Sequence, residues 1–389
     1  MSYLEKLLEG VEVEWSSLGD STFIEIANSG RTPVKASERI PGNVPYYGAN
    51  NIQDYVEGYT HEGEYVLIAE DGTQSIENYS IQWATGKFWA NNHVHVLRGT
   101  DKINSRFIFH YLRTVNFIPF LSGGDRAKLT KAKLAKIPIP IPPLSVQKEI
   151  VRILDSFTEL TAELTAELTA RKKQYDYYRE KLLSFEEGDV EWKPLGEVCD
   201  FQNGFAFQSN LFKDSGLPIV RITNINGVNV DLSDVKYFSP DDYNSGNPLN
   251  YAIVKGDILI AMSGATTGKI GYYNLDEKAY LNQRVGKFIP NKELLNNRFL
   301  FHFLLTKNEF LYVLAGGGAQ PNLSSNAIKE KLLIPIPPLS EQERIVAILD
   351  KFDVLTTSIS EGLPREIELR KKQYEYYRDL LLTFPKNNI

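Results

Sequence analysis

The 389-residue sequence predicts an α+β protein in which two α/β domains are joined by long helices. One stretch occurs twice, at residues 139–185 and 334–384, and each copy has the apolar spacing of a helix. The segments before the two copies hold short β-type runs with Gly, Asn and Asp turns, and then an aromatic helix near residues 105–115 and 297–305. Sparse markers recur in both segments in the same order, which indicates one fold used twice.

The first copy begins IPIPPLSVQKEIVRILDSF and ends RKKQYDYYREKLLSF; the second begins IPIPPLSEQERIVAILDKF and ends RKKQYEYYRDLLLTF. Alternating Ile and Pro removes backbone donors and fixes an extended chain, which excludes a helix and a central strand. Ser145 and Ser340 are the predicted N-caps, and Ser340 with Glu343 fits a capping box. The first copy then allows one helix of ~60 Å. Gly362 and Pro364 predict a kink or two helices in the second copy.

A TAEL tract in the first copy spaces Leu160, Leu164 and Leu168 by four. Because a helix turns every ~3.6 residues, this stripe drifts by ~40° per unit, and one unit added or removed would move the chain beyond the tract by ~6 Å. The tract is either a length adjuster with a defined step or a patch of good helix formers. The leucines are assigned to a helix–helix seam, together with Ile345, Ile348, Leu349 and Phe352 of the second copy.

The chain divides into five predicted regions. Residues 1–11 form a helix end, 12–136 the first globular domain, 137–188 a central helical region, 189–333 the second domain and 334–389 a C-terminal helical region. Both termini have the sequence of the same helix end, which predicts that they lie close together in a cyclic, pseudo-two-fold layout.

Composition excludes several classes of protein. No apolar run is long enough to span a membrane, and the acidic, amphipathic N-terminus is not a secretory signal. The single cysteine, Cys199, indicates a reducing compartment and cannot supply a cysteine-based zinc site, so we expect a cytoplasmic protein. The net charge of −6 argues against a strongly basic, stand-alone nucleic-acid binder but allows local basic residues.

No motif for catalysis is present. The sequence lacks a P-loop, a Gly-x-Gly-x-x-Gly after a strand, a paired-His metal motif and the Asn-Pro-Pro-Tyr-like motif of a DNA amino-methyltransferase. His93 and His95 alternate on a predicted strand, but a metal site is disfavoured because no carboxylate lies at ligand spacing. His110 and His302 recur in the aromatic helices and are expected in the core or at an interface.

Polar loops are the candidate nucleic-acid contacts, because Asn, Gln, Arg and Lys read base edges while Gly and Ser let amides approach phosphates. For any single residue, a turn-forming or core role is the alternative, and the basic run 126–136 is either a phosphate contact or a solvated helix face. The first-domain candidates are Tyr46, Tyr47, Asn50, Asn51, Thr73, Gln74, Asn91, Asn92, His93, Arg126, Lys128 and Lys131. The second-domain candidates are Arg221, Asn224, Ser263, Thr266, Thr267, Lys269, Asn282, Gln283, Arg284, Gln320 and Asn322.

The doubled IPIPPLS and RKKQYxYYR motifs, the TAEL tract and two VEWxxLG openings together resemble the specificity subunit of type I restriction–modification enzymes, in the branch with tandem TAEL repeats. The resemblance covers essentially the whole chain. It implies two target recognition domains that each read half of a bipartite DNA sequence, held apart by an antiparallel coiled-coil pair of helices. It also implies two methyltransferase subunits and restriction subunits as partners, with S-adenosylmethionine, ATP and Mg on those partners and no cofactor in this chain.

Two other functions are weighed. An enzyme that modifies DNA unaided is disfavoured by the absent motifs, and a non-catalytic protein-interaction scaffold with two binding heads is the runner-up. The Tyr-rich helix ends, Tyr175–Tyr178 and Tyr374–Tyr377, either pack in the seam or face the methyltransferase subunits. If the domains engage major grooves one turn (~34–36 Å) apart, one TAEL unit should change the tolerated spacer by about one or two base pairs.

Overall fold

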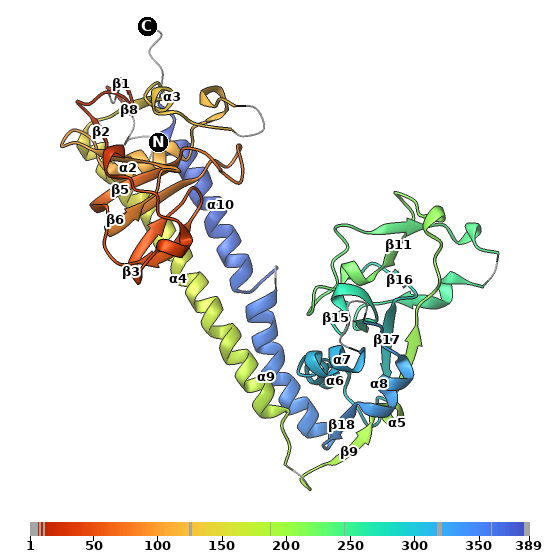
Figure 1. The fold of residues 1–389 in the computed structure, drawn as a ribbon. Coiled ribbons are helices and arrows are strands. Elements are labelled where there is room, and N and C mark those ends of the chain that lie inside the picture. The colour runs from red at the N-terminus through yellow and green to blue at the C-terminus, as the bar shows by residue number, and fades with distance from the viewer. Residues whose placement is uncertain are drawn as a thin grey trace. The chain divides into compact units, whose positions relative to one another are not determined.

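The computed structural model describes residues 7, 9–10, 12–123, 127–186, 188–244, 246–316, 321–358 and 360–384. The chain forms two units, Met1–Thr165 with Glu366–Ile389 and Ala166–Arg365, and each unit combines one globular domain with parts of long helices (Figure 1). Most of the predicted helix end at residues 1–11 lies outside the described residues, so the predicted proximity of the termini stays a prediction. No helix within the described ranges has the length and apolar character to cross a membrane.

The domain of the first unit is built on a six-stranded sheet with the order β2-β7-β5-β6-β3-β4. Its strands are β2 (Ile24–Ile26), β3 (Pro41–Tyr47), β4 (Ile52–Val56), β5 (His61–Ala69), β6 (Ile81–Ala90) and β7 (Val94–Gly99). Neighbouring strands are antiparallel except β3 and β6, which are parallel. The predicted aromatic helix is α2 (Ser105–Leu112), whose last six residues are buried in the core. A short helix, α3 (Lys131–Leu134), lies further along the chain.

The domain of the second unit divides its strands between two four-stranded sheets. One sheet contains β10 (Cys199–Asn203), β17 (Val285–Pro290), β14 (Ile258–Ala261) and β15 (Ile270–Tyr272). The other contains β12 (Lys236–Phe238), β11 (Leu217–Val220), β16 (Ala279–Leu281) and β13 (Ala252–Ile253), and here β11 and β16 are parallel. The helices are α5 (Leu195–Val198), α6 (Asn297–Leu305), α7 (Asn308–Leu314) and α8 (Ser325–Lys331).

The Ile-Pro tract of each copy is extended and lies in a two-stranded sheet. Strand β8 (Pro138–Ile141) pairs antiparallel with β1 (Glu14–Ser17), and β18 (Leu333–Ile336) pairs with β9 (Glu191–Pro194). The strands β1 and β9 begin at the Glu-Trp pairs of the two VEW openings. The first and last strands of each domain are therefore joined directly before the chain enters its helix.

The long helices are α4 (Leu144–Leu182), α9 (Leu339–Thr357) and α10 (Leu363–Leu382), so the second copy contains two helices. The predicted N-caps are wrong. Both helices begin one residue before the serine, and the N-cap of α9 is Pro338 with ψ of 145°. Because proline fixes φ and needs no amide partner, the chain turns from the extended tract into the helix at the proline itself. Ser340 and Glu343 therefore form no capping box.

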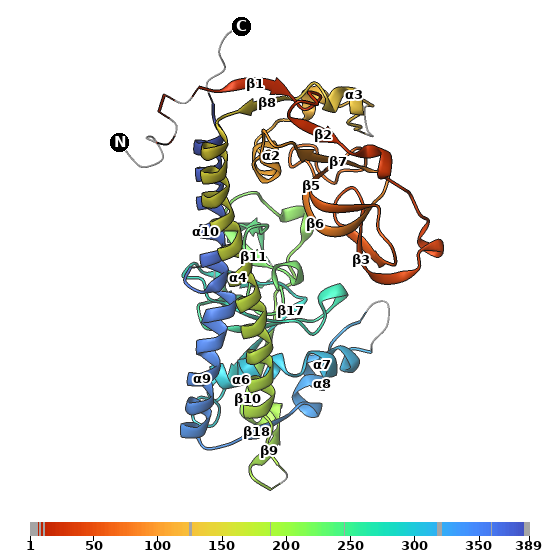
Figure 2. The ribbon, with the colours of Figure 1, turned by 90° about the vertical axis from the view of Figure 1, so that its left-hand side faces the viewer.

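The helices pack in pairs within each unit (Figures 1 and 2). In the first unit, Phe157 of α4 stacks on Tyr377 of α10, with ring centroids 5.2 Å apart. In the second unit, Tyr178 of α4 stacks on Phe352 of α9 at 5.6 Å. The leucines of the TAEL tract are half-buried, whereas Ile345 and Leu349 are fully buried in the core of the second domain.

Candidate nucleic-acid interface

The parallel strand pair of each domain ends at one edge of its sheet. The last residue of β3 lies opposite the last residue of β6, and the same holds for β11 and β16. The loops that follow such strands emerge side by side, which is where open α/β sheets bind ligands. We call this region the recognition edge: residues 48–51, 71–74, 91–93 and 128 in the first domain, and 221–224, 263–269, 282–284 and 322 in the second.

An asparagine shapes the same turn on both edges. The side-chain oxygen of Asn91 accepts the amide of His93 at 2.8 Å, and that of Asn282 accepts the amide of Arg284 at 3.3 Å. Each Asn also donates its backbone amide to the last carbonyl of the neighbouring parallel strand, at 3.3 and 3.1 Å. These are Asx turns, so both asparagines have the turn-forming role. The two residues after each of them are exposed.

The residue after β5 and the residue after β14 make the same backbone hydrogen bonds in the two domains. Glu70 donates its backbone amide to the His93 carbonyl at 2.8 Å, and Met262 donates to the Arg284 carbonyl at 2.8 Å. The carbonyls of Glu70 and Met262 each accept an amide from the segment before α3 or α8, at 2.7 Å in both cases. Isolated bridges then join residue 71 to 128 and residue 263 to 322. The equivalent pairs are therefore Asp71 and Ser263, His93 and Arg284, and Lys128 and Asn322.

Carboxylates occupy the first edge and hold its cations. Glu70 accepts from Arg31 at 2.6 Å and from Lys128 at 3.1 Å, and Asp71 contacts the Nδ1 atom of His93 at 2.5 Å. Burial acts to raise the pKa of Glu70, but the hydrogen bonds from Arg31 and Lys128 outweigh it and hold that pKa below its usual value. Glu70 is therefore ionised at neutral pH, and two carboxylates balance the two cations.

The second edge has no such pairing. Arg284 is exposed, and its guanidinium has no hydrogen-bond or ion-pair partner among the described residues. The neighbouring positions carry Ser263 and Asn322, which are uncharged, and the position of Glu70 is taken by Met262. The Ser263 hydroxyl is buried without a hydrogen-bond partner among the same residues. Within the ranges that the structure describes, Arg284 is therefore a free cation beside the neutral residues Met262, Ser263 and Asn322.

A buried polar cluster, which we call the anchor, fixes each domain to its helices. In the first unit, Asp155 of α4 accepts hydrogen bonds from Arg106 Nε and His110 Nε2, both at 2.8 Å, while His110 Nδ1 meets the Tyr374 hydroxyl at 3.1 Å. The second unit repeats these contacts at 2.9, 2.7 and 3.0 Å with Asp350, Arg298, His302 and Tyr175. The expectation that the two aromatic-helix histidines lie in the core or at an interface is confirmed, since both are fully buried.

The protonation states of the anchor follow from burial. Burial lowers the pKa of His110 and of His302, and this outweighs the opposing effect of the aspartate, so each imidazole is neutral. Burial acts to raise the pKa of Asp155, but hydrogen bonds from His110 and Arg106 lower it overall. Nε2 therefore carries the proton donated to the aspartate, and Nδ1 accepts from the tyrosine hydroxyl.

A second joint lies next to the anchor. Gln147 is fully buried; it accepts the Asn104 amide at 2.8 Å and donates to the Pro142 carbonyl at 2.7 Å. Gln342 makes the same two bonds, at 2.7 and 2.8 Å, in the second unit. Sequence reasoning missed the glutamines and aspartates of both joints. The available signal was that Gln and Asp occur at the same positions in both copies, among the shared apolar residues of the first helical turns.

A family model identifies the chain. The model of the type I restriction modification DNA specificity domain matches twice, over residues 11–171 and 187–369. The chain belongs to this family. It is 52% identical to a putative type I restriction enzyme specificity subunit of Haemophilus influenzae over 98% of each chain. It is 37% identical to the EcoR124I/EcoR124II specificity subunit of Escherichia coli, over 99% of this chain and 98% of that one.

Solved structures of the specificity family have the same fold. The S subunit of a type I restriction-modification system from M. genitalium matches with a TM-score of 0.65 at 16% identity, over 99% of this chain and 100% of that one. A chain of a type I R-M system, studied for its assembly and conformational transition, matches at 0.51 and 17% identity, over 95% and 97% of the two chains. The predicted α+β fold class is confirmed.

Only some of the residues predicted to contact DNA are exposed at the surface. The exposed ones are Asn51, Gln74, Asn92, His93, Lys128, Lys131, Lys269, Gln283, Arg284 and Asn322. The half-buried ones are Tyr47, Asn50, Thr73, Arg221, Ser263, Thr266 and Asn282. The buried ones are Tyr46, Asn91, Asn224 and Thr267, whose polar atoms bond within the domain. Arg126 and Gln320 lie outside the described residues.

The two alternating histidines have separate roles. His95 is fully buried, and its Nε2 atom bonds to the Leu129 carbonyl at 2.6 Å while Nδ1 contacts Asn28 at 2.9 Å. His93 instead faces Asp71 at the recognition edge. The described part of the chain contains no group of three or more His, Cys, Asp or Glu residues placed to hold a metal ion.

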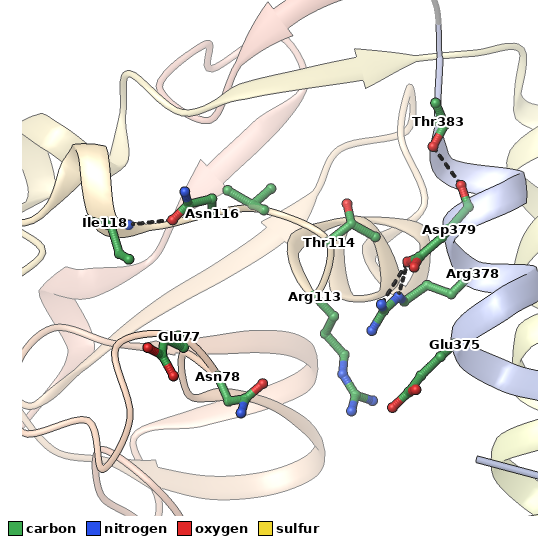
Figure 3. Close-up of a pocket in the computed structure, with 11 residues that line it drawn as sticks. Glu77, Asn78, Arg113, Thr114, Asn116, Ile118, Glu375, Arg378, Asp379 and Thr383 are labelled. Carbon is green, nitrogen blue, oxygen red and sulfur yellow. Dashed lines mark hydrogen bonds and ion pairs between the residues drawn. The ribbon is translucent and has the colours of Figure 1, made fainter. Parts of the chain in front are cut away.

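A polar hollow of about 680 Å³ lies elsewhere in the first unit, between α10 and the segment after α2 (Figure 3). Arg113 and Glu375 point into it, and Arg378 pairs with Asp379 at 2.7 Å on its wall. None of the predicted DNA contacts lines this hollow. It is therefore separate from the recognition edge.

Proposed function

We propose that this chain is a non-catalytic subunit that supplies the DNA sequence specificity of a type I restriction–modification complex. Each domain reads one half of an asymmetric, bipartite target in double-stranded DNA. The observation that supports this most directly is the pair of recognition edges, which share one hydrogen-bonded backbone frame but present different side chains. One frame with two sets of side chains suits two readers of different sequences.

The helices dock two methyltransferase subunits in this proposal. Tyr177 of α4 and Tyr376 of α10 occupy equivalent places in the two RKKQYxYYR motifs and are 57% and 64% exposed, although their neighbours Tyr175 and Tyr374 are buried. Two equivalent exposed tyrosines suit two copies of one partner, because tyrosine is a frequent anchor of protein interfaces. Restriction subunits complete the cytoplasmic complex, and S-adenosylmethionine, ATP and Mg are bound by the partner subunits.

The TAEL tract sets the gap between the half-sites. The tract lies within the uninterrupted helix α4, and the hydroxyls of Thr161 and Thr165 each bond back to the carbonyl four residues earlier, at 2.7 Å. Deleting Thr165–Leu168 would shorten the helix by ~6 Å and should change the spacer by about one or two base pairs. An unchanged spacer after this deletion would refute this role.

Methylation mapping of a genome that carries this chain with its cognate methyltransferase subunit tests the proposal. The expected result is an asymmetric motif of two half-sites with a fixed gap. A single contiguous motif would mean that one domain does not read DNA. No motif at all would favour the alternative function, a protein-interaction scaffold with two binding heads.

A further inference from the structure

We infer that residues 93 and 284 are the matched specificity-determining position of the two domains, and that they read opposite hydrogen-bond partners. Arg284 reads a guanine in the second half-site. His93, held by Asp71, reads the amino group of an adenine or cytosine in the first half-site. This inference rests on the proposed function and adds to it the residues and the chemistry of base recognition.

Backbone hydrogen bonds place the two side chains equivalently. His93 and Arg284 each receive an amide on their carbonyl at 2.8 Å, from the residue that follows β5 or β14. Each also donates its own amide to the side chain of the turn asparagine. The backbone of each residue is therefore tied to equivalent elements of its own domain. Its side chain starts from an equivalent place on the recognition edge. Both side chains are exposed there.

The chemistry around Arg284 favours a guanine. An arginine fork matches the O6 and N7 acceptors of guanine with two parallel hydrogen bonds. The guanidinium is free among the described residues, and the matched carboxylates of the other edge, Glu70 and Asp71, are replaced here by Met262 and Ser263. No internal ion pair within the described part of the chain therefore has to break before Arg284 contacts a base.

The surroundings of His93 favour a hydrogen-bond acceptor, whereas Arg284 is a donor. Asp71 lies 2.5 Å from Nδ1 and accepts a hydrogen bond from that nitrogen when it is protonated. We assign the ring proton to Nδ1, a tautomer that leaves Nε2 with a lone pair. A lone pair accepts a hydrogen bond from the N6 amino group of adenine or the N4 amino group of cytosine. The nearby Lys128 ammonium is paired with Glu70 at 3.1 Å, and Asp71 lies 3.8 Å away, so its charge is balanced within the domain.

Base analogues test the two assignments with the chain bound to its methyltransferase subunit. Duplexes carry 7-deazaguanine, which lacks N7, at each guanine of the second half-site in turn. One such replacement should weaken binding of the unaltered chain roughly 10-fold and leave the Arg284→Ala variant unaffected. In the first half-site, one base analogue without the exocyclic amino group should weaken binding of the unaltered chain but not of His93→Ala. Asp71→Ala should give the same result as His93→Ala.

Matched controls separate base contacts from phosphate contacts. Lys269→Ala removes an exposed cation at the end of the second edge, and Lys131→Ala removes one beside the first edge; both should weaken binding to every duplex equally. Arg284→Lys keeps the charge but loses the planar fork, so its 7-deazaguanine penalty should be smaller than that of the unaltered chain and larger than that of Arg284→Ala. Analogue penalties that are equal in the unaltered chain and the variants would overturn the inference. If methylation mapping yields two half-sites while these penalties are equal, only the inference fails; if it yields no such motif, the proposed function fails.

Discussion

The two units use the same anchor and different recognition edges. Both anchors contain the same Arg, His, Asp and Tyr at nearly equal distances, although the two domains have different sheets. The edges share the backbone frame and its turn asparagine, but the side chains beside them change from carboxylates and their cations around His93 to neutral groups around Arg284. A buried charge left without its partner is costly, whereas an exposed side chain can change freely. The contacts that attach each domain to the helices are therefore the same in both units, whereas the side chains at the recognition edges differ.

The anchors differ in one respect, which predicts the largest effect. Arg298 pairs with Asp350 at 2.6 Å and with Asp353 at 2.8 Å, but the residue equivalent to Asp353 in the first unit is Thr158. Asp155→Ala should therefore lower the free energy of unfolding of the first unit by about 3 kcal/mol, because it strands Arg106 and a buried histidine. Asp350→Ala should cost the second unit about 1–2 kcal/mol, since Asp353 still holds Arg298.

Denaturant unfolding with amide hydrogen exchange, followed separately on β5 and β14, measures the two effects. Asp176→Ala is the control, because Asp176 forms an exposed ion pair with Arg179 on α4 and should cost about 0.3 kcal/mol. Equal losses for Asp155→Ala and Asp350→Ala would contradict the compensating role of Asp353.

The second largest predicted effect is that acid destabilises the first unit more than the second. Burial lowers the pKa of His95 and His110 in the first unit and of His302 in the second. Each histidine is therefore neutral in the folded state, while its unfolded form takes up a proton below pH 6.5. Stability is fully present above this value and is lost as the pH falls toward the folded pKa, by about 1.4 kcal/mol per pH unit for each histidine. The first unit should lose stability about twice as steeply.

Hydrogen exchange at pH 7.5, 6.5 and 5.5, corrected for intrinsic rates, measures this difference. His95→Asn should reduce the slope of the first unit to that of the second. Identical acid sensitivity of the two units in the unaltered chain would show that buried histidines do not dominate this pH range.

The smallest predicted effect concerns the shared helix motif. Tyr177→Ala and Tyr376→Ala should each weaken the binding of one methyltransferase copy by about 1–2 kcal/mol, since a tyrosine anchor is lost. Titration calorimetry of single and double variants should resolve one weakened site in each single variant and two in the double variant. Tyr59→Ala, an exposed tyrosine of the first domain, is the control and should change neither site.

Sequence reasoning predicted the duplicated helical scaffold better than the side chains of the recognition edges. The repeat, the Ile-Pro tracts and the Gly362–Pro364 interruption are local signals, and the structure has the elements they predict. The anchor aspartates were missed because one charged residue in an apolar helix face gives no sign of its partner, which for Asp155 lies 45 residues away at His110. The burial of Asn91 was missed for the same reason, since only the folded sheet brings it beneath the loops.

The contrast between one attachment and two recognition surfaces can be tested in a single chain. Residues 189–333 are replaced by a second copy of residues 12–136, and the methylation pattern is mapped with the cognate methyltransferase subunit. If the anchor holds either domain alike and the edge alone reads DNA, both half-sites should carry the sequence that the first domain reads in the unaltered chain. A folded chimera that still methylates the original second half-site would contradict the account.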